Sequence, residues 1–161
     1  MKRLILYYSI SGHNENLAIQ LKKDLNCDIE KLEDGFSRVF KNNTWLLLIF
    51  GGMYGTFNFL NKGKRIISNF NNYDQIVLVG PVWAFHLFPM GRGFLKRNRD
   101  RISSLIVVSI CGGGKKYRKN IIEDINKYYK KEPDKIVVIS DKEFKDKEYL
   151  EEYKELVSFC S

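Results

Sequence analysis

The sequence predicts an α/β fold in which a doubly wound, five-stranded parallel sheet carries helices on both faces. Short apolar runs rich in Ile, Val and Leu recur along the chain, as is typical of strands covered on both sides. Segments with helical spacing of apolar residues lie between these runs. Because parallel strands need a crossover between them, this alternation favours a parallel sheet.

The apolar runs place the five strands at residues 4–8, 28–32, 75–80, 105–110 and 135–140. Three apolar stripes predict helices, and they consist of Leu17, Ala18, Leu21 and Leu25; of Ile121, Ile122, Ile125, Tyr128 and Tyr129; and of Tyr149, Leu150, Tyr153, Leu156, Val157 and Cys160. No internal repeat or flexible linker divides the sequence. We therefore expect a single domain over residues 1–161.

Composition indicates a soluble protein, because 44% of the 161 residues are hydrophobic and 29% are charged. The three cysteines are an odd number without a Cys-x-x-Cys pair, so the sequence suggests no disulfide framework and no metal site. The apolar run at residues 4–8 is too short for a signal peptide. These features predict a reduced, cytoplasmic setting.

Residues 42–61 contain no charged side chain and are long enough for a membrane span. Gly51, Gly52 and Gly55 interrupt this segment, together with Thr56 and Asn58, and they weaken a continuous apolar helix. We expect a buried helix that breaks into a glycine-rich turn, and no membrane span.

The turn from Ser9 to Glu15 follows the first strand and opens the first helix. Free backbone N–H groups and the positive end of a helix dipole favour a phosphate at such a position. The turn lacks both the Gly-x-Gly-x-x-Gly and the Walker pattern. The hydroxyls of Ser9 and Ser11 and the amide of Asn14 could instead bind a phosphate monoester through neutral donors. Alternatively, these side chains only cap the helix.

Ligands of doubly wound sheets bind at the carboxyl ends of the strands, where the strand order switches. The loops that meet there are the turn after the first strand, residues 81–86 after the third and residues 111–114 after the fourth. They offer, in that order, a phosphate cradle, large aromatic side chains and bare glycine backbone. Together they predict a site for a phosphorylated planar heterocycle.

These three loops resemble the flavin-binding loops of the flavodoxin family in order and spacing. The resemblance rests on Ser9-Ile10-Ser11-Gly12-His13-Asn14-Glu15, on Val77-Leu78-Val79-Gly80-Pro81-Val82-Trp83 and on Ser109-Ile110-Cys111-Gly112-Gly113-Gly114, and it covers nearly the whole chain. It implies the strand order 2-1-3-4-5, with FMN at the switch point, as in flavodoxin itself. The FMN-binding residues that it implies are Ser9, Ile10, Ser11, Gly12, His13, Asn14, Pro81, Val82, Trp83, Ala84, Phe85, Cys111, Gly112, Gly113, Gly114 and Tyr117.

The chain departs from the family pattern at two places. His13 and Asn14 replace the usual Asn-Thr pair of the phosphate turn. In the family a glycine is common after the tryptophan, but this chain has Ala84 and Phe85 there. A positive φ, which glycine adopts easily, is costly for these residues because they have a Cβ.

Several candidate residues also have a simpler interpretation. Trp83 and Tyr117 could pack in the core, and His13 could be an ordinary turn residue. Cys111 is better interpreted as a small buried hydrophobe than as a reactive thiol. His86 has no predicted partner.

The net charge of the sequence is +8, and segment 92–119 by itself has a surplus of positive over negative side chains of the same size. If this segment forms a basic rim beside the flavin, it would attract an acidic redox partner protein or a phosphorylated small molecule. Nucleic acid is not expected, because aromatic residues are not interleaved with the basic ones. A solvated face without a partner is the other interpretation.

These features favour an electron carrier that transfers electrons through non-covalently bound FMN. One alternative is a flavin-dependent oxidoreductase that acts on a small molecule such as a quinone with NAD(P)H. A second alternative is a binding module of the same fold without flavin. No general acid or base pair stands out in the loops, and this favours the carrier over the enzyme.

Overall fold

The computed structural model describes residues 1–33 and 69–160. The helix and glycine-rich turn that we expect within residues 42–61 lie outside the described residues.

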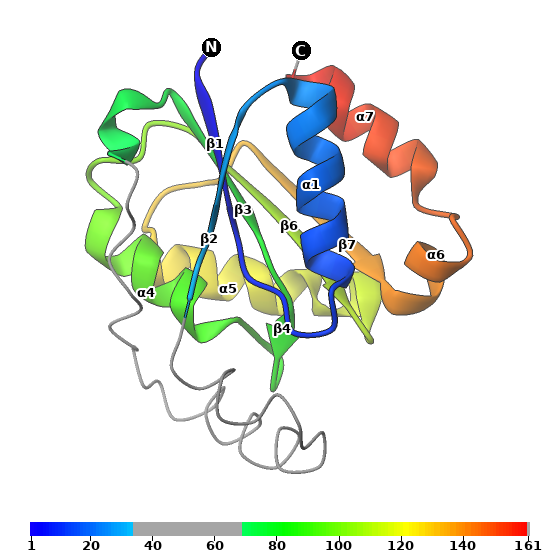
Figure 1. Ribbon diagram of the computed structural model, residues 1–161. Helices are drawn as coiled ribbons and strands as arrows, with labels where there is room; N and C mark the ends of the chain where they lie inside the picture. The colour runs from blue at the N-terminus through cyan, green and yellow to red at the C-terminus, as the bar shows by residue number, and fades with distance from the viewer. Residues whose placement is uncertain (34–68, 161) are drawn as a thin grey trace.

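Five parallel strands form the central sheet in the order β2-β1-β3-β6-β7 (Figure 1). The strands are β1 (Arg3–Tyr7), β2 (Asp28–Lys31), β3 (Gln75–Val79), β6 (Leu105–Cys111) and β7 (Lys135–Ser140). Each predicted strand is present, with ends shifted by at most one residue. When only the five strands of this sheet are counted along the chain, their order is 2-1-3-4-5. The predicted fold class and topology are therefore confirmed.

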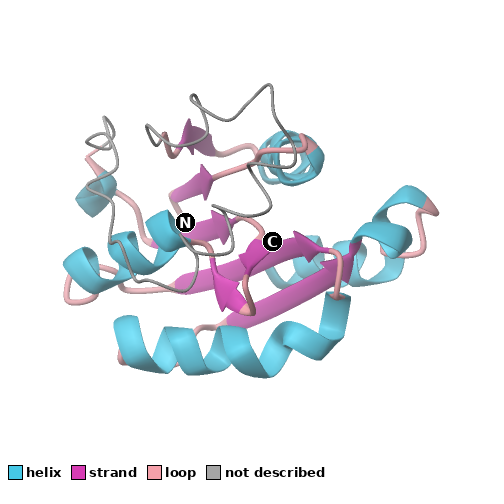
Figure 2. Ribbon diagram, turned by 90° about the horizontal axis from the view of Figure 1, so that it is seen from below, coloured by secondary structure: helices cyan, strands magenta, loops and turns pink. Residues whose placement is uncertain are grey.

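Helices cover both faces of this sheet, as the view from below shows (Figure 2). The helices α1 (His13–Leu25) and α7 (Leu150–Cys160) cover one face, while α4 (Pro89–Asn98) and α5 (Arg118–Tyr128) cover the other (Figure 1). No helix within the described part of the chain is long and apolar enough to cross a membrane.

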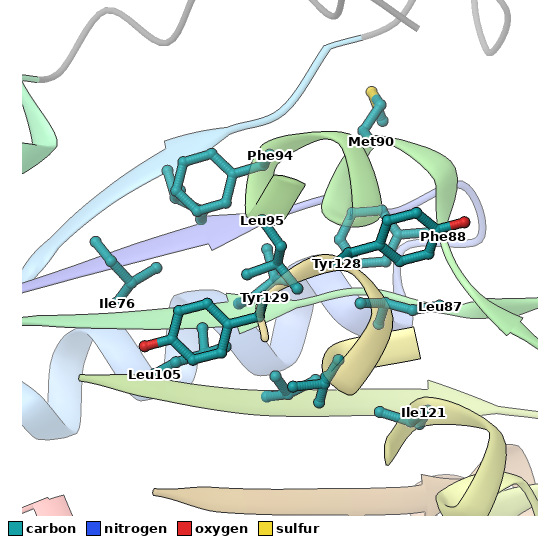
Figure 3. Packing of buried hydrophobic residues seen from close by; sticks show 14 of the residues in the cluster. Ile76, Leu87, Phe88, Met90, Phe94, Leu95, Leu105, Ile121, Tyr128 and Tyr129 are labelled. Carbon is teal, nitrogen blue, oxygen red and sulfur yellow. The ribbon is translucent and has the colours of Figure 1, made fainter. Parts of the chain in front are cut away.

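The core consists of two apolar clusters, one on each face of the sheet, because successive side chains of a strand point to opposite faces. Leu4, Leu6 and Val107 face α4 and α5, and Figure 3 shows Phe94, Leu95 and Tyr129 in the same cluster. Ile5, Val77 and Val108 belong to the second cluster, which α1 and α7 complete with Leu17, Leu21, Tyr153 and Leu156. Alternating residues of the same strands therefore join the sheet to both helix layers.

Two short helices are not predicted by the apolar pattern. Helix α4 has Pro89 in its first turn and contains Gly91 and Gly93. Because glycine has a low helix propensity, the sequence pattern of this segment does not indicate a helix. It is nevertheless buried from Pro89 to Leu95, because its packing against the sheet and α5 outweighs its weak intrinsic propensity. Helix α6 (Asp141–Lys145) starts at a capping box between Ser140 and Glu143.

The expected loop after β3 folds into an antiparallel hairpin of β4 (Val82–Trp83) and β5 (His86–Leu87). Ala84 and Phe85 form its two-residue turn, with φ of 46° and 69°. This combination is typical of a type I′ turn, which favours Asn-Gly. The two residues therefore adopt the positive φ that we expected their Cβ atoms to disfavour.

Candidate functional site

Three loops meet at the carboxyl edge of the sheet because β1, β3 and β6 are neighbours in the strand order. They are the turn that leads into α1, the β4–β5 hairpin, and the glycine loop that leads into the short helix η2 (Gly114–Tyr117). The start of α1 and the hairpin both lie at the lower end of the sheet in Figure 1. The structure thus brings together the three loops that the sequence identified.

The turn at residues 9–12 leaves the N-terminus of α1 without a side-chain cap. Gly12 is the N-cap residue with φ of 91°, a conformation that favours glycine, and its N–H donates to the Ser9 hydroxyl over 3.1 Å. A Cβ at Gly12 would meet no atom within 4 Å, and the side chains of Ile10 and Ser11 are exposed. The turn therefore borders open space, where the first-turn N–H groups can bind an anion.

Asn14 has a different role from the one that we predicted for its side chain. It is only 3% exposed, and its amide donates to the Ile110 carbonyl over 3.1 Å. Its oxygen accepts the Ile110 N–H over 3.0 Å. The side chain thus fastens the start of α1 to the end of β6, and it is not free to bind a phosphate. Asn14 can contribute only its backbone N–H.

Two carboxylates lie close to this turn, and each has a partner. Asp141 is 3.2 Å from Nδ1 of His13, a partner that the sequence pattern did not reveal. Glu15 accepts the Tyr7 hydroxyl over 2.8 Å and contacts Nζ of Lys31 at 3.3 Å. The pKa of Glu15 is lowered, mainly because its carboxylate accepts the Tyr7 hydrogen bond. The pKa of Tyr7 is raised to about 12, mainly by burial and to a lesser extent by the neighbouring Glu15. Of these partners, Lys31 carries a positive charge that offsets the negative charge of Glu15 beside the turn.

The hairpin contributes both a core residue and an exposed tip. Trp83 packs partly against the first cluster and meets Tyr8 edge-on, with ring centroids 5.7 Å apart. Phe85 at the tip is 60% exposed, and its ring lies 5.6 Å from that of Tyr117, also edge-on. Pro81 and Val82 are half-buried at the base of the hairpin. Trp83 is thus partly a core residue, while Phe85 and Tyr117 form an aromatic pair across two loops.

The glycine loop exposes backbone next to a buried thiol. Cys111 is 5% exposed, and burial raises the pKa of its thiol, in agreement with a small buried hydrophobe. Gly112 is exposed, whereas the Tyr117 ring covers Gly113 so closely that a Cβ there would overlap it. Gly114 is buried against Ser140. Tyr117 therefore packs on its own loop and also on the first cluster.

His86 has a partner in the structure that we did not predict. Its Nδ1 lies 3.2 and 3.3 Å from the two carboxylate oxygens of Asp124 on α5. Asp124 is only 4% exposed and also accepts the Leu87 N–H over 2.7 Å. Its position between Ile121 and Ile125 could have revealed it, because an acid within an apolar helix stripe needs a buried partner.

The basic segment 92–119 does not form one rim, and this part of the prediction is wrong. Arg92 is 3% exposed beneath Tyr128. The cations at residues 96–101 precede β6, whereas those at residues 115–119 follow it. The seven residues of β6 separate the two groups by roughly 20 Å. Only the second group lies near the three loops, and there Lys115 pairs with Glu152.

No protein-family model and no curated protein sequence matches the chain. Among solved structures, it is similar to a flavoprotein in complex with FMN from Lactobacillus acidophilus NCFM, with 19% identity, a TM-score of 0.63, and 91% of this chain and 97% of that chain covered. A putative flavoprotein from Bacteroides uniformis ATCC 8492 has 11% identity and a TM-score of 0.66, over 87% of this chain and 90% of that one.

A third similar structure is a short-chain flavodoxin associated with a non-canonical PDU bacterial microcompartment. It has 15% identity and a TM-score of 0.53, and all of both chains is covered. These likenesses agree with the strand order and with the place of the three loops. The chain therefore has the flavodoxin-like fold.

Proposed function

We propose that this chain binds one FMN non-covalently and acts as a redox protein. The observation that carries the proposal is the uncapped N-terminus of α1 at Gly12, which the strand order places beside the hairpin and the glycine loop. The likeness to a flavoprotein in complex with FMN supports this choice of cofactor. When bound, FMN supplies the ability to accept and donate one or two electrons.

The residues present fit such a cofactor. The backbone N–H groups of His13, Asn14 and Glu15 and the hydroxyls of Ser9 and Ser11 would hold its phosphate, because the turn borders open space. The hairpin from Pro81 to Phe85 and the loop from Cys111 to Tyr117 would enclose its ring system. Lys31, which pairs with Glu15, would reduce the repulsion that this carboxylate exerts on a phosphate dianion.

Electron transfer to a docked protein is the use of the flavin that we favour. Lys116 and Lys119 are exposed near the loops, so an acidic partner protein or a phosphorylated small molecule remains the proposed partner on this side. A flavin-dependent oxidoreductase acting on a small molecule is the second candidate. The pair of His86 and Asp124 favours this candidate, because a histidine paired with a carboxylate can transfer a proton, and the sequence pattern of the loops did not reveal such a pair.

Titration of the apo-protein with FMN and riboflavin tests the phosphate role of the turn. We expect FMN to bind at least about tenfold more tightly, because a charge-assisted hydrogen bond contributes about 1.5–3 kcal/mol. Ser11→Asp should weaken FMN binding by like-charge repulsion, whereas Ser103→Asp, the same change at an exposed residue before β6, should not. Equal affinities for the two flavins, or full FMN affinity in Ser11→Asp, would contradict the proposal.

A further inference from the structure

The outer edge of β7 has no neighbouring strand among the residues that the structure describes, because β7 is last in the order β2-β1-β3-β6-β7. A cavity of about 310 Å³ lies along this edge, and residues 134–138 line it. We call this cavity the β7 groove. An open strand edge presents backbone N–H and C=O groups that another extended segment can bind.

The backbone of Val138 is available for such pairing. The Ile136 carbonyl accepts a hydrogen bond from Arg118 over 2.9 Å, so it points away from β6. The Ser140 N–H, which donates to the Glu143 carboxylate over 2.7 Å, also points away from β6. Because alternate residues of a strand present their backbone groups to the same side, the N–H and C=O of Val138 point outward as well. Neither group has a hydrogen-bond partner within residues 1–33 and 69–160.

The two walls of the β7 groove carry opposite charges. Lys115 in η2 and Arg118 at the start of α5 line one wall, whereas Glu152 and Glu155 on α7 line the other. Because α5 and α7 cover opposite faces of the sheet, each wall belongs to one face (Figure 1). In the described part of the chain, the Arg118 guanidinium has no carboxylate partner.

Two further charged residues line the groove near the start of β7. Nζ of Lys135 donates to the Glu155 carbonyl over 3.4 Å and thus offsets part of the charge of the acidic wall. Asp134 accepts the Ser104 hydroxyl and the Leu105 N–H, so its carboxylate is engaged. The acidic wall therefore depends on Glu152 and Glu155.

One ion pair connects the two walls across the edge of β7. Nζ of Lys115 bonds to the Glu152 carboxylate and lies 4.0 Å from that of Glu143. The Lys115 and Glu152 side chains are 62% and 33% exposed, and ion pairs of this kind contribute little to stability. A ligand that supplies an acidic group to Lys115 and a basic group to Glu152 would replace this pair without leaving either charge unpaired.

Successive side chains of an extended segment point to opposite sides. A segment that adds to β7 therefore presents one half of its side chains to the basic wall and the other half to the acidic wall. We propose that the β7 groove binds an extended segment of a partner protein in which acidic and basic residues alternate. The acidic side chains pair with Lys115 and Arg118, the basic ones pair with Glu152 and Glu155, and the segment exchanges backbone hydrogen bonds with Val138. This inference does not depend on a bound flavin.

The experiment compares two capped peptides of the same composition and zero net charge, Lys-Glu-Lys-Glu-Lys-Glu and Lys-Lys-Lys-Glu-Glu-Glu. Each is titrated into the wild-type chain at low ionic strength, and backbone amide NMR shifts give the affinity. Only the alternating peptide can present one sign of charge to each wall when it is extended. We expect it to bind at least about tenfold more tightly than the block peptide. Equal affinities would overturn the proposal.

Amide hydrogen exchange tests whether the peptide pairs with the strand edge. The alternating peptide should slow exchange at Val138 at least about tenfold and leave Val137, whose N–H faces β6, unchanged. Unchanged exchange at Val138 would overturn the strand pairing. Protection of Val138 that grows with protein concentration in the absence of peptide would show that a second copy occupies the edge, and it would also overturn the proposal.

Matched variants test the two walls. Arg118→Ala should weaken binding of the alternating peptide about tenfold, whereas Lys119→Ala, the next cation on α5 and not part of the lining, should not. On α7, Glu155→Ala should weaken it, whereas Glu151→Ala should not. Full affinity in both Arg118→Ala and Glu155→Ala would overturn the role of the charged walls.

Discussion

At the scale of single residues, Asn14 shows how one polar side chain can hold two loops in register. Its two hydrogen bonds to Ile110 connect the turn before α1 to the last part of β6, just before the glycine loop. Both partners are buried, so water cannot replace Asn14 if it is lost. The position of the proposed anion site relative to the glycine loop therefore depends on this side chain.

Asn14→Ala should lower the free energy of unfolding by about 2–3 kcal/mol, because it leaves buried backbone groups of Ile110 without the partners that they have in the wild type. Asn16→Ala, an exposed change in the same helix, should alter it by less than about 0.5 kcal/mol. Urea denaturation measures both. Equal stability of the two variants would contradict the role that we assign to Asn14.

At the scale of secondary-structure elements, the β4–β5 hairpin combines a strained turn with strong anchors. Ala84 and Phe85 have positive φ, which costs roughly 1–2 kcal/mol for each residue with a Cβ. Asp124 holds the return strand through the Leu87 N–H, and Tyr117 packs against the Phe85 ring. Tertiary contacts thus retain a turn that its own sequence disfavours.

Replacing Ala84 by Gly should raise the free energy of unfolding by about 0.5–1 kcal/mol, because glycine adopts a positive φ without steric cost. The same change at Ala18, which is helical and buried in α1, should instead lower it by about 1 kcal/mol or more. Thermal and urea denaturation of the two variants provide the comparison. A loss of stability in Ala84→Gly would show that the turn is not strained.

At the scale of the whole molecule, buried tyrosines join the helices to the sheet and to one another. Tyr153 on α7 donates a hydrogen bond to Asp24 on α1, and Tyr129 donates to the Ile102 carbonyl over 3.3 Å. Burial is the main cause that raises the pKa of Tyr7, Tyr129, Tyr149 and Tyr153. The fold therefore favours the protonated phenols.

This preference predicts that the protein loses stability in alkali. Phenols ionise near pH 10 in an unfolded chain, whereas the pKa of Tyr7 is about 12 in the folded one. The contribution of Tyr7 is fully present below about pH 10 and is lost as the pH rises towards 12. Urea denaturation at pH 8 and at pH 11 should show the loss, and Tyr7→Phe should reduce it. Equal stability of the wild type at both pH values would disprove this prediction.

The sequence by itself determined the fold class, the five strands and the three loops at the carboxyl edge, because strand and helix periods are local properties of the chain. It did not reveal α4, whose glycines weaken the local signal while burial stabilises the helix. The candidate loops could thus be predicted, but the roles of several side chains within them could not.

Only the tertiary structure decided which polar groups meet. Asn14 and Ile110 are 96 residues apart, His13 and Asp141 are 128 apart, and His86 and Asp124 are 38 apart. Such pairs depend on how helices and strands pack, and no local pattern encodes that packing. They nevertheless decide the chemistry of the site, because a buried carboxylate or amide must satisfy its hydrogen bonds with whichever groups the fold brings to it.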